Sequence, residues 1–83
     1  MSRSAGKHLR VLSHLRKNEW NKAHAIVMGM RDKLAFRIHG LLHRIEGDLG
    51  NADYWYRRAS RPPCHDDTRE EGLEIARTLS RST

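Results

Sequence analysis

The chain has 83 residues and a formal net charge of +6, with 37% hydrophobic and 31% charged residues. This length allows one small domain, and the composition fits a folded domain and excludes a disordered tail. No apolar run approaches the roughly 20 residues of a membrane-spanning helix, and the basic N-terminus lacks the continuous apolar stretch of a signal peptide. The single cysteine, Cys64, excludes an internal disulfide and fits a cytoplasmic location.

The charge is distributed unevenly along the chain. Residues 1–47 hold ten Lys or Arg against three acids, whereas residues 48–83 hold six Arg against seven acids. A basic half predicts an acidic partner, such as a nucleic acid, an anionic surface or an acidic protein. The alternative interpretation is that these charges only keep the surface soluble.

Apolar residues recur at three- and four-residue steps, which predicts helices almost throughout the chain. We expect a first helix over about 6–17 and a second over about 19–31. The apolar stripe of the first helix contains Leu9, Leu12 and Leu15. A third helix is expected over about 33–46, and Gly47 is a suitable residue to end it.

The second half of the chain predicts two more helices. One should begin near Asn51, as its N-cap, and run to about Ser60, because Pro62-Pro63 forbids further helix. The other should begin after Asp66 or Asp67, with the acids of its early turns placed favourably for the helix dipole. Its expected apolar face contains Leu73, Ala76 and Leu79, and its early acids are Glu70 and Glu71.

Short connections between helices imply antiparallel neighbours. The expected fold is therefore all-α, with about five short antiparallel helices in one domain over residues 1–83. These helices would form two hairpins and a C-terminal capping helix, with residues 1–5 and 81–83 frayed.

One stretch carries the spacing of a known helical repeat. It reads Phe36-x2-His39-Gly40-x2-His43, then Ala52-x3-Tyr56, then Ala59 and Pro62-Pro63. This pattern resembles the tetratricopeptide repeat, whose motif is W-x2-L-G-x2-Y, then A-x3-F, then P. The resemblance covers about residues 34–63 well and 8–31 loosely, and it implies a helical hairpin that serves as a protein-interaction module. The stretch is also similar to one in short bacterial proteins, and that likeness implies no activity.

The third expected helix has an apolar face flanked by arginines, which is the first candidate site. Its residues are Leu34, Arg37, Ile38, Leu41, Arg44 and Ile45. In a repeat this face would turn toward a concave groove, where the arginines could hold an acidic or amphipathic protein segment by charge-assisted hydrogen bonds. Two alternatives stay open: the first or fifth helix fills the groove, or two chains cover each other's stripe in a homodimer.

The histidines form a second candidate site. Their spacing puts His39 and His43 on one helix face, with Glu46 one turn further, and His24 would approach if the second helix packed there. Such a group can chelate a metal ion, but the rings could equally be structural partners of a tyrosine or a carbonyl, or act in catalysis. No Ser or Cys nucleophile, phosphate loop or His-Glu-x-x-His pattern accompanies them, so an enzyme is not favoured and no catalytic residue or cofactor is assigned.

The basic side of the first helix is a candidate nucleic-acid interface. Its residues are Lys7, Arg10, His14 and Lys17. Contacts between these side chains and phosphates would release counterions and make the affinity fall steeply with salt. The run from Tyr54 to Arg58 also mixes aromatic and basic residues, but Trp55 and Tyr56 share a face with small residues and are expected in the core.

Overall fold

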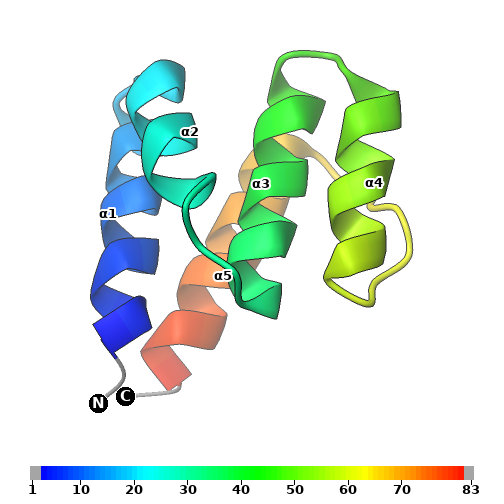
Figure 1. The fold of residues 1–83 in the computed structure, drawn as a ribbon. Helices are drawn as coiled ribbons and strands as arrows, with labels where there is room; N and C mark the ends of the chain where they lie inside the picture. The colour runs from blue at the N-terminus through cyan, green and yellow to red at the C-terminus, as the bar shows by residue number, and fades with distance from the viewer. Residues whose placement is uncertain (1–2, 82–83) are drawn as a thin grey trace.

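The computed structural model describes residues 3–81, and in this range the chain is helical without strands (Figure 1). The five helices of the described range are α1 (Arg3–Arg16), α2 (Trp20–Val27), α3 (Lys33–Ile45), α4 (Leu49–Arg58) and α5 (Thr68–Arg81). None of them combines the length and the apolar character that crossing a membrane requires. The predicted all-α class is confirmed.

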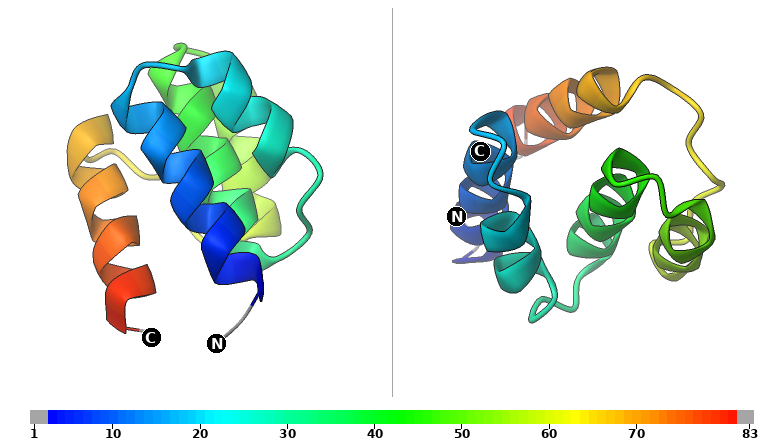
Figure 2. Two further views of the ribbon diagram at one scale, coloured as in Figure 1. Left: turned by 90° about the vertical axis from the view of Figure 1, so that its left-hand side faces the viewer. Right: turned by 90° about the horizontal axis from the view of Figure 1, so that it is seen from above.

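The helices are arranged as two antiparallel hairpins and a returning helix (Figure 1). The most extensive packing is between α3 and α4 and between α1 and α2, and α5 contacts both α3 and α1. Seen from above, the two hairpins form an open arc, and α5 lies along one side of it (Figure 2). Because α5 lies against α3, it covers part of the face that the sequence assigned to a partner.

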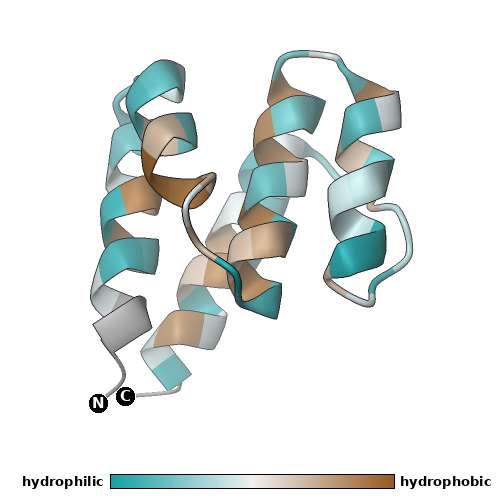
Figure 3. Ribbon diagram, in the orientation of Figure 1, coloured by the Kyte–Doolittle hydropathy of each residue, from teal (hydrophilic) through white to brown (hydrophobic). Residues whose placement is uncertain are grey.

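The hydrophobic core lies where α1, α2, α3 and α5 meet. Val11, Val27, Ile38, Leu42 and Ile75 are its central side chains, and each is at most 1% exposed. Apolar segments mark the helices that share this core, most visibly on α2, α3 and α5 (Figure 3). The α3–α4 hairpin is completed by Tyr56, which is 1% exposed.

The predicted apolar faces of α1 and α5 were partly wrong. Leu9 and Leu73 are 52% and 47% exposed, respectively, although both were expected to pack. Where the structure describes the side chains of these two helices, the buried residues are His8, Val11 and Leu12 in α1, and Glu71, Ile75 and Leu79 in α5. Each buried face includes a polar residue. A prediction that uses only the apolar residues therefore places the buried face on the wrong side of the helix.

Caps define the beginnings of α3 and α4. The Asp32 side chain accepts a hydrogen bond from the amide of Ala35 at 3.1 Å, and it also bonds Nε2 of His8 at 2.7 Å. Gly47 ends the preceding turn with a φ of 86°, as predicted. The N-cap of α4 is Asp48, which accepts from the amide of Asn51 at 3.3 Å; the prediction of Asn51 as the cap was wrong.

Other predicted boundaries also moved. α2 ends at Val27, before the expected position near 31. The amides of Gly29 and Met30 donate to the carbonyls of Ile26 and Val27, three residues earlier, and these tight turns replace the α-helical hydrogen bonds. Asp67 accepts from the amide of Arg69 at 2.8 Å, in agreement with its expected capping role. Of the residues expected to fray, 3–5 and 81 are helical, and 1–2 and 82–83 lie outside the described residues.

Candidate functional site

The arginine-flanked face of α3 packs largely within the chain. Ile38 and Leu41 are buried, Leu34 is half-buried, and only Ile45 of this set is exposed. Nε of Arg37 donates to Oε2 of Glu71 at 3.2 Å, and Nη1 of Arg44 donates to Oε1 of the same carboxylate at 2.7 Å. The acid that these arginines were expected to recruit from a partner is therefore supplied by α5.

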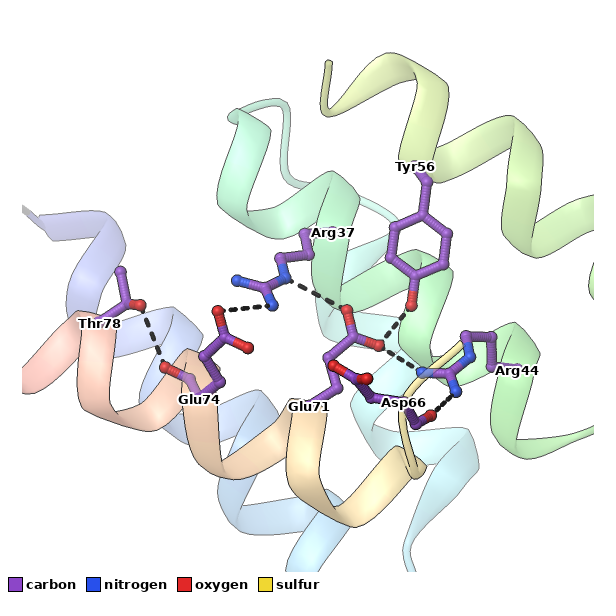
Figure 4. A network of polar contacts seen from close by, with 7 residues as sticks. All are labelled: Arg37, Arg44, Tyr56, Asp66, Glu71, Glu74 and Thr78. Carbon is purple, nitrogen blue, oxygen red and sulfur yellow. Dashed lines mark hydrogen bonds and ion pairs between the residues drawn. The ribbon is translucent and has the colours of Figure 1, made fainter. Parts of the chain in front are cut away.

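Glu71 lies in the first turn of α5, as predicted, and it has a further role at this face that its position in the sequence did not indicate. It is 1% exposed and also accepts the hydroxyl hydrogen bond of Tyr56 at 2.5 Å (Figure 4). Burial, together with the Glu71 carboxylate, raises the pKa of Tyr56 far above its usual value, so the phenol stays protonated. Arg44 additionally donates to the carbonyl of Asp66, which fixes the start of α5 against α3. The network thus joins α3, α4 and α5.

Three histidines meet between α2 and α3. His24 comes from α2, and His39 and His43 come from successive turns of α3. Nε2 of His39 lies 3.1 Å from Nε2 of His24, and one ring nitrogen from each of the three residues lies within 4.8 Å of the other two. The expectation that His24 approaches the pair on α3 is confirmed.

Two tryptophans hold these rings in place. The Trp20 ring stacks on His24 with centroids 4.7 Å apart, and the Trp55 ring stacks on His39 at 3.8 Å. Nε1 of Trp20 donates to the Leu42 carbonyl at 2.7 Å, which anchors that indole to α3. Trp55 was expected in the core, and instead it is partly buried and supports His39. The four-residue step from Trp20 to His24 places both rings on one face of α2, and this spacing could have indicated the role of Trp20 from the sequence.

The third histidine has a carboxylate partner. Nδ1 of His43 lies 2.6 Å from Oε1 of Glu46, so this bond fixes the ring and leaves Nε2 available. Glu46 was predicted as a metal ligand, and the structure places it behind His43 as the group that orients the ring. His43, Glu46 and Asp48 are a second set of side chains close enough to hold a metal ion, but the Asp48 carboxylate already caps α4.

The environment favours the neutral forms of His39 and His24. Burial lowers the pKa of His39 to about 4, and the neighbouring His24, His43 and Arg58 disfavour its charged form further. Burial and His43 also lower the pKa of His24, against the opposing effect of Glu46. Neutral imidazoles keep a free lone pair, which is the form that can accept a hydrogen bond or bind a cation.

We predict that the metal-free protein loses stability as the pH falls from about 6.5 to about 4. The folded-state pKa of His39 is lower than its unfolded value, so the unfolded chain binds more protons in this window. The expected loss from this ring is on the order of 2 kcal/mol, and it is complete below the folded-state pKa. Urea unfolding at a series of pH values, with a chelator present, measures it.

The matched control for this pH series is His39→Phe, which keeps a ring against Trp55 and removes the titrating group. Its free energy of unfolding should fall less over the same pH window. Equal slopes for the wild type and the variant would contradict the prediction.

A shallow pocket of about 350 Å³ opens onto the cluster. Its lining residues are His24, Met28, His39, His43, Asn51 and Trp55. The three histidines therefore face a space that solvent or a small ligand can enter. Three imidazoles beside an open position are the donor set of a four-coordinate metal site with one exchangeable ligand.

The predicted nucleic-acid stripe on α1 is a separate candidate site. Lys7, Arg10 and Lys17 are exposed, whereas His14 bonds Glu19 at 2.8 Å. In the aromatic run, Tyr56 is buried as expected, and the guanidinium of Arg58 lies over the Phe36 ring at 4.4 Å. The hypothesis of phosphate binding along α1 stays a prediction.

No protein-family model, curated protein or solved structure matches this chain. The resemblance of residues 34–63 to a tetratricopeptide repeat therefore stays a prediction. The candidate site rests on its geometry.

Proposed function

We propose that the chain binds a transition-metal ion through His24, His39 and His43. The observation that carries this proposal is the convergence of three ring nitrogens, from two helices, within 4.8 Å of one another. Two nitrogens that bind one tetrahedral zinc ion at its usual bond length lie roughly 3.3 Å apart. Nε2 of His24 and Nε2 of His39 are 3.1 Å apart, so small ring movements would admit the ion.

The surroundings of His43 support this proposal. Metal-binding histidines commonly use their second nitrogen to bond a carboxylate, which sets the tautomer and the direction of the lone pair. The bond of 2.6 Å between Nδ1 of His43 and Glu46 has this arrangement, with Nε2 left for the ion. The stacked rings of Trp20 and Trp55 lower the entropy that ordering His24 and His39 would cost.

The donor set favours one class of ion. Neutral imidazoles suit zinc, copper, nickel and cobalt, whereas calcium and magnesium prefer oxygen ligands. The protein supplies three ligands, and the pocket leaves room for a fourth from water or from a small molecule. A site with one exchangeable ligand suits a protein that transfers a metal ion, senses it or uses it in catalysis.

The test is a metal titration of tag-free protein that has been stripped with a chelator. We expect calorimetry to give one zinc ion per chain, and substitution with Co²⁺ to give the visible absorption of a four-coordinate complex. Zinc at a hundred times its Kd should stabilise the fold by about 2.7 kcal/mol, because the ion binds the folded state. Absence of saturable binding would overturn the proposal.

Three phenylalanine variants locate the site. His24→Phe and His43→Phe keep aromatic rings in the cluster, and each should weaken zinc binding at least tenfold. His65→Phe is the matched control, because His65 is exposed and lies outside the cluster. Unfolding in the absence of metal verifies that each variant folds. Equal loss of binding in all three variants would show adventitious coordination and contradict the assignment.

A further inference from the structure

A larger hollow, of about 930 Å³, lies between α1, α3 and α5. Its lining residues are Leu12, Leu15, Arg16, Asn18, Trp20, Leu41, Ile45, Thr68, Arg69, Gly72, Leu73 and Ala76. Figure 2 shows α1 and α5 side by side in front of α3, and we call the hollow the α1–α5 groove. It shares Leu41 and Ile45 with the face that was first expected to bind a partner.

Exposed apolar side chains mark this groove as incompletely covered. Ile45 is 46% exposed and Leu73 is 47% exposed, while Leu41 beneath them is buried. Leucine and isoleucine side chains on a groove wall gain free energy when a partner removes them from water. A domain of this size buries a modest core, so an apolar occupant would also stabilise it.

The charges around the groove indicate the kind of occupant. Arg16 and Arg69 are its charged lining residues, and both are exposed. They approach from α1 and α5, on either side of the apolar surface. Exposed guanidinium groups on both walls favour carboxylates on the occupant, by charge-assisted hydrogen bonds.

A second copy of this chain is a poor occupant. Each chain carries a net charge of +6, so self-association through a basic groove would bring like charges together. The carboxylate of Glu71, which could have attracted such a basic surface, is buried against Arg37 and Arg44. The charge balance therefore favours a different, acidic protein.

We propose that the α1–α5 groove docks an amphipathic helix of another protein, with its apolar side on Ile45 and Leu73 and its carboxylates toward Arg16 and Arg69. Apolar anchors three or four residues apart on such a helix match a groove walled by helices. The metal proposal does not depend on this interaction, because the histidines line a different pocket.

The test is site-specific photo-crosslinking in the source cell. A photoreactive phenylalanine analogue replaces Leu73 in the groove or, as a matched control, Leu49, which is 63% exposed and outside the groove. We expect adducts from position 73 in excess over position 49. Mass spectrometry of the crosslinked peptides should map them to an acid-rich amphipathic segment of another protein.

A binding assay with a synthetic peptide of the crosslinked segment completes the test. Wild-type protein should bind it, and Arg16→Glu/Arg69→Glu should weaken binding at least tenfold, more so at low salt. His65→Phe should leave this affinity unchanged, because His65 lines neither the groove nor the histidine cluster. Adducts that map to a second copy of this chain or to nucleic acid, no excess over position 49, or an affinity that is insensitive to both arginines would overturn the proposal.

Discussion

Replacing Glu71 with alanine should lower the free energy of unfolding by about 3–5 kcal/mol. The substitution leaves the side chains of Arg37 and Arg44, which are 5% and 10% exposed, without their shared carboxylate, and the Tyr56 hydroxyl without its acceptor. Arg37 would keep only the half-exposed Glu74 carboxylate at 3.5 Å, and Arg44 would lose its carboxylate partner, so two mostly buried cations would be poorly compensated. Urea denaturation followed by circular dichroism measures the loss.

The control for this experiment lies one turn away on the same helix. Glu74→Ala removes a carboxylate that is half-exposed and 3.5 Å from Arg37, so the expected change is below about 1 kcal/mol. Glu71→Gln keeps the shape and removes the charge, and its effect should lie between those of the two alanine variants. An effect of Glu71→Ala no larger than that of Glu74→Ala would refute the role given to this network.

Gly40→Val should destabilise the protein by about 3 kcal/mol. A Cβ at this position would lie 3.1 Å from the Tyr56 ring and 3.2 Å from the Ala52 carbonyl oxygen. The ring is held by its bond to Glu71 and the carbonyl belongs to the backbone of α4, so neither can move away easily. The hairpin would have to open, and thermal or urea unfolding would report it.

Another helical glycine provides the comparison. A Cβ added at Gly50, in α4, meets no heavy atom within 4 Å, so Gly50→Val should change stability by less than about 0.5 kcal/mol. A similar loss in both variants would mean that helix propensity, and not the contact between α3 and α4, controls the result at Gly40.

Local chemistry made part of this fold predictable. The periodicity of residues 33–45 is strong, and Gly47 ends that helix through its positive φ, so α3 was predicted almost to the residue. The spacing that predicted a helical hairpin includes Gly40 and Ala52, and the two helices approach closely at these small residues. These signals lie within single helices or between neighbours in the sequence.

Features that depend on distant packing were not predictable in this way. A buried glutamate looks like any other acid of a first turn until the arginines 27 and 34 residues away are placed against it. Leu9 and Leu73 were assigned to the core because a pattern of apolar residues cannot show which side of a short helix meets another. For the histidines, the four-residue step identified His39 and His43, and packing of α2 brought His24 to them.

Trp20 has a position whose consequence extends beyond support of one ring. Its indole stacks on His24 and also lines the α1–α5 groove. The proposed metal ion and the proposed helix would therefore both bind next to this one side chain. If a docked helix changes the preferred orientation of this indole, it changes the affinity of the cluster for its ion, and reciprocity requires that the ion changes the affinity for the helix by the same factor. The same indole is an intrinsic fluorophore, so in a Trp55→Phe variant, where it is the only tryptophan, its emission would report both binding events and their coupling without a label.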